Sequence, residues 1–136
     1  MFLIISQGKS VALYFLLNTI MKKLTAKFRL WINTKDGINA LGDGKWRLLN
    51  TIEKTGSLAS ACRDLDISYR KAWGDLAKMQ KALNVRLIEK HRGGEKGGDT
   101  RLTPYGKRLM KAYQRLHNDI EKAVKKSCAK YFRTIK

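Results

Sequence analysis

The stretch GSLASACRDLDISYRKAWGDLAKMQKALN, residues Gly56–Asn84, decides the fold. It contains two helical patterns separated by Asp66–Ser68, a connection too short for the two helices to lie antiparallel. Ser57 and Ser68 each stand where a hydroxyl can cap the first turn of a helix. The pattern is typical of a helix-turn-helix, whose second helix enters the DNA major groove. A plain helical hairpin with a solvated basic face is the alternative.

Both helical patterns have one apolar face, because hydrophobic residues recur in them at spacings of three and four. The expected inward residues are Leu58, Ala61, Cys62 and Leu65 in the first helix and Ala72, Leu76, Met79 and Leu83 in the second. Polar and basic residues open the second helix, where long hydrogen-bond donors reach base edges. The residues expected to contact DNA there are Ser68, Tyr69, Arg70 and Lys71. Ser57, which starts the first helix, is a further expected contact.

The chain is strongly basic. Its 136 residues carry 29 Lys and Arg against 11 Asp and Glu, which gives a formal net charge of +18. Such a surplus repels itself in a compact fold, and a polyanionic partner relieves the repulsion. Nucleic acid is the leading candidate, because neutralising phosphates releases condensed counterions. An anionic membrane surface is the competing partner. The length corresponds to a single domain.

The sequence has no catalytic or metal-binding pattern. His91 and His117 are isolated, and Cys62 and Cys128 form neither a metal-ligand spacing nor a disulfide framework. Cys62 lies on the inward face of its helix, so we expect a small buried thiol. We therefore expect a protein that is not an enzyme, holds no metal or cofactor, and works in a reducing cytoplasm.

Residues 1–23 form an N-terminal extension, and the domain occupies residues 24–136. The mostly apolar run Val11–Ile20 has ten residues, whereas a bilayer-spanning helix needs about 20. Lys22 and Lys23 follow the run, although a signal peptide carries its positive charge before the apolar core. We expect the extension to be disordered or to pack as an incidental helix. A membrane anchor is the alternative.

Alternating polar and apolar residues over Leu24–Asn33 predict a half-buried strand. Asp36-Gly37 is a hairpin turn, so Ile38–Leu41 is expected to return as a second strand. A helix then leads to Gly56, near its C-terminal cap. Its expected inward residues are Trp46, Leu49 and Ile52. This helix is the first of a three-helix core.

A glycine-rich hairpin follows the helix-turn-helix. Val85–Lys90 suits a strand, Arg101–Thr103 suits its partner, and the four glycines between His91 and Asp99 break regular structure. A hairpin in this place is a wing. A phosphate-cradling nucleotide loop is excluded, because that loop needs a Gly-Lys-Ser/Thr signature and a helix directly after it. The wing residues expected beside phosphates or the minor groove are Arg92, Lys96 and Arg101.

Thr103 and Pro104 open a long last helix, which is expected to run to about Tyr131. An apolar stripe follows one face of it, and a single small domain cannot bury the whole stripe. We expect a homodimer, and packing of the stripe on the N-terminal strands of the same chain is the alternative. The expected interface residues are Leu109, Tyr113, Leu116, Ile120 and Val124.

The chain resembles the DNA-binding domain of the ModE family of molybdate-responsive transcription regulators. The resemblance is carried by LGDGKWRLLNTIEKTGSLASACRDLDISYRKAWGDLAKM, residues 41–79, and by RGGEKGGDTRLTPYGKRLM, residues 92–110. The chain is also similar to the LysR-type domain, which shares the Leu-Thr-x-x-Gly motif after the wing. The resemblance implies a mainly α fold with a small β component. It implies a winged helix-turn-helix with an N-terminal β-hairpin, dimerised through its flanking helices on a palindromic operator.

The resemblance also brings a departure. Molybdate-sensing members carry C-terminal oxyanion-binding domains, whereas this chain ends at Lys136, so molybdate is a suggested effector by family resemblance alone. The alternatives are constitutive DNA binding, a signal from a partner protein, or control of another regulon. The expected function is sequence-specific binding of double-stranded DNA in transcription regulation. A non-specific architectural DNA- or RNA-binding protein is the alternative.

Overall fold

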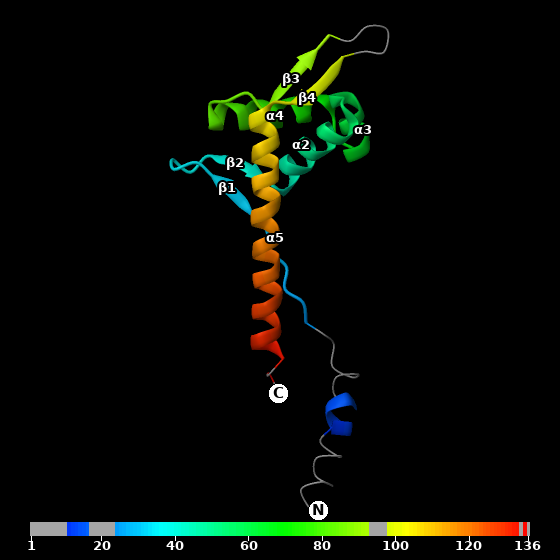
Figure 1. Cartoon of the computed structure of the whole chain (residues 1–136), viewed down its shortest axis with the longest axis vertical. Helices are drawn as coiled ribbons and strands as arrows, with labels where there is room; N and C mark the ends of the chain where they lie inside the picture. The colour runs from blue at the N-terminus through cyan, green and yellow to red at the C-terminus, as the bar shows by residue number, and fades with distance from the viewer. Residues whose placement is uncertain (1–10, 17–23, 93–97, 134, 136) are drawn as a thin grey trace, which may run out of the picture. The chain divides into compact units, whose positions relative to one another are not determined.

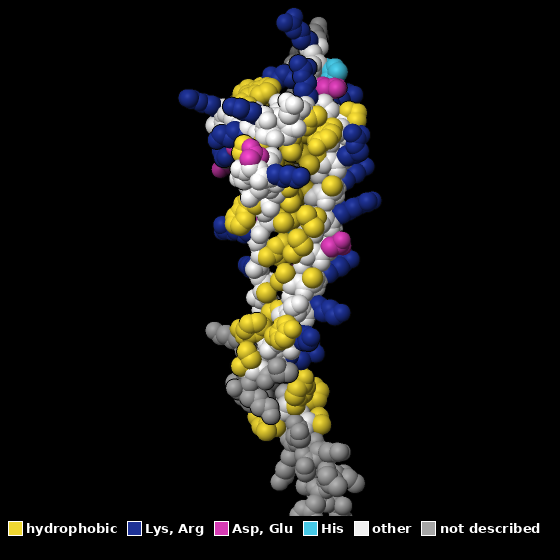
Figure 2. Space-filling view, turned by 90° about the vertical axis from the view of Figure 1, so that its left-hand side faces the viewer, with side chains coloured by type: hydrophobic (Ala, Val, Ile, Leu, Met, Phe, Trp, Pro, Cys, Tyr) yellow, Lys and Arg dark blue, Asp and Glu magenta, His cyan; other side chains and the backbone are white. Residues whose placement is uncertain are grey.

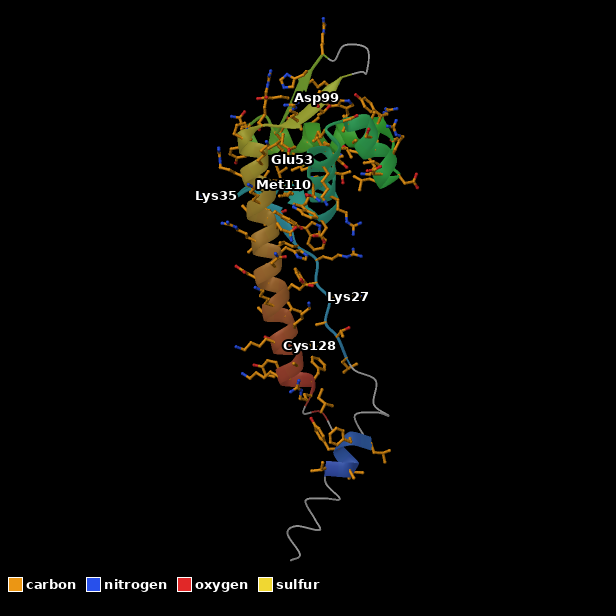
Figure 3. All side chains as sticks on the ribbon, turned by 45° about the vertical axis from the view of Figure 1, so that its right-hand side comes forward. Lys27, Lys35, Glu53, Asp99, Met110 and Cys128 are labelled. Carbon is orange, nitrogen blue, oxygen red and sulfur yellow. The ribbon has the colours of Figure 1, made fainter. Side chains whose placement is uncertain are left out.

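A computed structural model describes residues 11–16, 24–92, 98–133 and 135. The contacts divide the chain into two compact units, Phe28–Glu121 and the chain ends Met1–Lys27 with Lys122–Lys136. In the second unit, residues 11–16 are helical. The Sγ atom of Cys128, labelled in Figure 3, lies 3.9 Å from the carbonyl oxygen of Leu24. The predicted domain boundary at residue 24 stays a prediction.

Three helices form the core of the larger unit, as predicted (Figure 1). They are α2 (Asp43–Thr55), α3 (Leu58–Leu65) and α4 (Tyr69–Leu83). The buried cluster takes residues from all three helices and from the strands: Leu41, Leu48, Leu49, Ile52, Leu58, Ala61, Cys62, Ala72, Leu76, Met79, Leu87, Ile88, Leu102 and Tyr113. Every buried side-chain nitrogen or oxygen atom of the described residues has a hydrogen-bond partner, so the core leaves no polar group unpaired.

The breaks between these helices follow local rules. Gly56 ends α2 in the left-handed region at φ 69°, where glycine is free of strain, and its N–H donates to the Ile52 carbonyl. The Ser57 hydroxyl then accepts a hydrogen bond from the Ser60 N–H and caps α3. The predicted helix boundaries and the predicted Ser57 cap are therefore confirmed.

The N-terminal hairpin is shorter than predicted. It consists of β1 (Trp31–Asn33) and β2 (Asn39–Gly42), which pair antiparallel. The prediction of a strand from residue 24 is wrong for residues 24–30, which have no regular structure. The reason is pairing. The returning strand has four residues, so nothing in it reaches beyond Trp31 to pair with the preceding segment.

The wing strands are β3 (Ile88–His91) and β4 (Asp99–Leu102), in an antiparallel hairpin that projects beyond α3 and α4 (Figure 1). The predicted strand start at Val85 is wrong by three residues. The backbone N–H of Val85 completes the end of α4 by donating to the Gln80 carbonyl at 3.2 Å. The N–H of Leu87 donates to Gln80 Oε1 at 2.8 Å, so neither group is available to a strand partner.

Helix α5 (Pro104–Phe132) begins at the predicted proline. The Thr103 hydroxyl accepts from the Gly106 N–H at 3.0 Å and donates to the Arg86 carbonyl at 2.8 Å. A Cβ atom on Gly106 would lie 2.4 Å from the Leu87 carbonyl oxygen. The Leu-Thr-x-x-Gly motif therefore joins the end of the wing to the start of α5 by close backbone contact. Within the described part of the chain, no helix is both long enough and apolar enough to cross a membrane.

This close contact predicts the effect of two matched substitutions on stability. Gly106→Ala should lower the free energy of unfolding by about 2 kcal/mol, because the added methyl group meets backbone that cannot turn away. Gly74→Ala in α4 meets nothing within 4 Å and should raise stability by about 0.5–1 kcal/mol. Urea unfolding followed by circular dichroism measures both. Equal stability of Gly106→Ala and wild type would contradict the packing described.

Candidate nucleic-acid interface

The turn between α3 and α4 fixes how α4 is presented. Asp66 adopts the left-handed conformation at φ 52°, and its N–H donates to the Arg63 carbonyl at 3.2 Å. The N–H of Ile67 donates to the Cys62 carbonyl at 3.0 Å. This pair of bonds closes the C-terminus of α3 and lets the chain change direction at once. Burial of the Cys62 side chain raises the pKa of its thiol, as expected for the small buried thiol that we predicted.

The first residues of α4 face solvent. One of their polar groups caps the helix, one forms an ion pair, and one has no partner among the described residues. The Ser68 hydroxyl accepts from the Lys71 N–H at 3.1 Å and caps the helix. Lys71 Nζ pairs with Asp75 Oδ2 at 2.9 Å, one turn along the helix. Arg70 is exposed, and its guanidinium makes no hydrogen bond or ion pair with any described residue. Arg70 is therefore the basic side chain here that is free to bind a ligand.

The wing is anchored to the helix-turn-helix at Gly56. The N–H of Thr100 donates to the Gly56 carbonyl at 2.9 Å, and Thr100 is only 3% exposed. Asp99, labelled on the wing in Figure 3, accepts from Arg101 Nε at 2.6 Å. Arg101 and Arg92 are exposed, whereas the predicted wing residue Lys96 lies outside the described residues. The exposed arginines thus stand on a hairpin that is fixed at its base.

Two residues that were not among the predicted DNA contacts lie beside them, Trp73 on α4, which is half-buried against the core, and Lys90 on β3. Lys90 Nζ lies 4.2 Å from the centre of the Trp73 ring and 3.3 Å from the Tyr69 hydroxyl oxygen. The Tyr69 and Trp73 rings meet edge to face at 6.2 Å. The spacing of four between two aromatic residues was visible in the sequence, but the register that brings Lys90 over them was not.

A second basic side chain borders the start of α4. Lys45 Nζ donates to both the carbonyl and the side-chain oxygen of Asn39, each at 2.9 Å. Burial lowers the pKa of Lys45. An open groove beside it is also lined by Arg29, Lys71 and Asp75. The positive surface therefore extends from α4 toward the N-terminal hairpin.

The predicted dimer residues do not share one environment. Tyr113 is 3% exposed, and its hydroxyl lies within hydrogen-bonding distance of two acceptors, Asp43 Oδ1 and the Leu30 carbonyl oxygen, which share its one proton. Burial and the Asp43 carboxylate raise the Tyr113 pKa. Leu109 packs against the same core. These two residues therefore pack within their own chain, which was the alternative to a dimer interface. Leu116 is 41% exposed, and Ile120 and Val124 are half-buried.

The charged side chains are mainly basic. Figure 2 shows Lys and Arg side chains along the edges of one face, with few Asp and Glu side chains among them and hydrophobic side chains down its middle. The described residues contain no group of three His, Cys, Asp or Glu side chains that could hold a metal ion. The arrangement therefore suits an anionic polymer.

Comparisons with known proteins agree with this geometry. Residues 44–107 match the family described as "Bacterial regulatory helix-turn-helix protein, lysR family". The chain is 34% identical over 96 residues to the molybdenum transport protein ModE of Azotobacter vinelandii, covering 71% of this chain and 35% of that protein. It is 39% identical over 77 residues to the transcriptional regulator ModE of Haemophilus influenzae, covering 57% of this chain and 30% of that one.

A third relative is the DNA-binding transcriptional dual regulator ModE of Escherichia coli K12, 37% identical over 76 residues, with 56% of this chain and 29% of that protein covered. The chain spans about a third of the length of these curated relatives. Among solved structures, oxidized OxyR from Corynebacterium glutamicum matches with a TM-score of 0.47 at 23% identity, over 62% of this chain and 26% of that chain.

The domain is a winged helix-turn-helix DNA-binding domain, as its fold, the exposed basic start of α4 and the family match over residues 44–107 together show. Over the matched residues the chain is similar in sequence to three ModE proteins, at 34–39% identity.

The cap on α4 predicts the effect of removing one hydroxyl. Ser68→Ala should lower the free energy of unfolding by about 1 kcal/mol, because the Lys71 N–H loses its acceptor at the helix start. Ser127→Ala, at an exposed site within α5, should change stability by no more than about 0.5 kcal/mol. Thermal unfolding of both variants measures the difference. A Ser68→Ala protein as stable as the control would show that this hydroxyl does not cap the helix.

Proposed function

We propose that this chain is a transcription regulator that binds double-stranded DNA in a sequence-specific way. The observation that carries the proposal is the exposed start of α4, with Arg70 unpaired and its neighbours fixed by caps and ion pairs. An unpaired guanidinium on a rigid helix can make a bidentate contact to guanine in the major groove. Ser68, Tyr69 and Lys71 are the other proposed contacts on this helix, and Ser57 on α3.

The wing supplies the contacts outside the major groove in this proposal. Arg92, Arg101 and Lys96 are proposed to bind phosphates or the minor groove beside the recognition helix. Phosphate contacts add affinity that is insensitive to sequence and falls steeply with salt. Specificity then depends on α4, and most of the salt dependence on the wing and on the other basic side chains.

The regulator is proposed to act as a homodimer on a palindromic operator, because a twofold protein presents two identical recognition helices. Support comes from α5, which has 29 residues and carries Leu116 at 41% exposure with Ile120 half-buried. Tyr113 and Leu109 are less suited to an interface, since their side chains already pack within the domain. We place this activity in the cytoplasm. Molybdenum, mentioned in the names of some relatives, stays outside the proposal because only about a third of those proteins is aligned.

A second candidate is a non-specific architectural protein that binds DNA or RNA through charge. The net charge of +18 favours it. The two candidates differ in a selection of duplexes from a random pool. The regulator enriches a palindrome, whereas the architectural protein leaves the pool without a preferred sequence.

For the regulator, Arg70→Ala should weaken binding to the selected duplex by about 10- to 100-fold, the equivalent of about 1–3 kcal/mol for one base contact. Binding to random duplex should fall far less. Arg115→Ala on α5 is the control, since it removes another exposed arginine far along the sequence. Fluorescence anisotropy with both duplexes measures the ratio. An equal loss on both duplexes would make Arg70 a phosphate contact.

The dimer proposal has its own test. Leu116→Lys should yield monomers in light scattering and weaken binding to the palindrome, because a charge enters an apolar contact. Asn118→Lys adds the same charge at an exposed position two residues along α5 and should leave the mass unchanged. If both variants keep the wild-type mass, the interface does not include Leu116.

A further inference from the structure

The start of the recognition helix is joined to the wing by a cluster of three side chains, Tyr69, Trp73 and Lys90. Tyr69 and Trp73 lie one turn apart on α4, and their rings pack edge to face. Lys90 comes from β3, and its ammonium group lies 4.2 Å from the centre of the Trp73 ring. It also lies 3.3 Å from the Tyr69 hydroxyl oxygen and 5.9 Å from the centre of that ring. One wing residue thus contacts both aromatic side chains.

These contacts occupy the Lys90 ammonium group. A cation over an indole face is held by the ring quadrupole, and its remaining hydrogen atoms can bond to an oxygen. β3 also fixes the backbone of Lys90, because Lys90 pairs with Thr100 and Thr100 is anchored to Gly56. Lys90 is therefore placed to hold Tyr69 in position rather than to extend toward a phosphate.

The same contacts set the direction of the Tyr69 hydroxyl. A lysine ammonium group only donates, so the Tyr69 oxygen must accept from Lys90. The neighbouring Trp73 side chain and the Lys90 ammonium group lower the pKa of Tyr69, although burial acts in the opposite direction. With its oxygen engaged as an acceptor, the hydroxyl proton points away from both partners. Tyr69 is 47% exposed, so this proton is offered to the ligand.

A hydroxyl fixed as a donor discriminates between base edges. In the major groove, guanine N7 and O6, adenine N7 and thymine O4 accept hydrogen bonds, whereas the amino groups of cytosine and adenine donate. A donor directed at a cytosine amino group finds no acceptor.

We propose that Tyr69 is a specificity-determining residue that donates its hydroxyl proton to an acceptor on a base edge, and that Lys90 is the positioning residue that holds the hydroxyl in this state. The proposal rests on the proposed function. Lys90, a wing residue, then affects base recognition by positioning Tyr69 and does not itself contact a base or a phosphate.

The first experiment tests Tyr69. The duplex enriched by wild-type protein is varied one base pair at a time, and affinities are measured for wild type and Tyr69→Phe. The expected result is that Tyr69→Phe loses about tenfold of the preference at one base pair only, with an unchanged dependence on salt. Tyr105→Phe, at an exposed tyrosine on α5, should keep every preference. Preferences that are all unchanged in Tyr69→Phe would overturn the proposal.

The second experiment tests Lys90. Lys90→Met keeps the length of the side chain and should lower the preference at the same base pair by several-fold, while Tyr69→Phe/Lys90→Met should be no worse than Tyr69→Phe. Lys90→Arg keeps a cationic donor and should keep the wild-type preference. Lys111→Met removes one positive charge elsewhere and should also keep it. If Lys90→Met instead weakens selected and random duplexes equally and reduces the salt slope by about one, Lys90 is a phosphate contact and the positioning role is wrong.

A measurement without DNA separates the failure of this proposal from that of the proposed function. In NMR spectra of protein with ¹³C-labelled tyrosine rings, Lys90→Met should raise the pKa of the Tyr69 hydroxyl, whose signal is assigned with Tyr69→Phe. An unchanged pKa would overturn the Lys90–Tyr69 contact whether or not the protein selects a sequence. Wild-type protein that enriches no duplex would overturn both the regulator and the base contact. Unfolding curves confirm that every variant is folded.

Discussion

Hydrogen bonds at Thr103 join the wing, the segment between α4 and β3, and the start of α5. Its N–H donates to the Leu87 carbonyl at 2.9 Å, and its hydroxyl both donates to the Arg86 carbonyl and accepts from the Gly106 N–H. Because Thr103 is only 7% exposed, water cannot replace these partners cheaply. The register of β4 against β3 follows from this junction, and so does the placement of the side chains on these two strands relative to α4.

What could be predicted from the sequence is what nearby residues decide. The caps of α3 and α4, the end of α2 at Gly56 and the proline that opens α5 each depend on neighbours within a few positions, and all were predicted correctly. The strand expected over Leu24–Asn33 failed over residues 24–30 because alternation describes one strand only. Whether such a segment pairs depends on the length of its partner, and β2 ends after four residues.

In the candidate site, too, features set by nearby residues could be predicted and features set by distant residues could not. The exposed position of Arg70 and its neighbours at the start of α4 could be predicted from their place after a short turn, because position on a helix is a local property. Lys90 could not, since its contacts with Tyr69 and Trp73 depend on the register of the wing, and that register is set at Thr100 and Thr103. Tyr113 shows the converse. Its helical spacing fits a pairing stripe, yet the hydroxyl binds Asp43 and Leu30, distant in sequence.

The partners of the basic side chains within the chain therefore say more about their roles than the net charge does. Lys71 and Arg101 are held by Asp75 and Asp99, and Lys90 is held by two aromatic rings. A side chain held in one geometry has less conformational entropy to lose when DNA arrives. Arg70, unpaired, loses more of it but offers all of its donors to a base or a phosphate. A surface that combines held and free cations can bind any duplex through charge and still distinguish sequences where the held groups fix the geometry of contact.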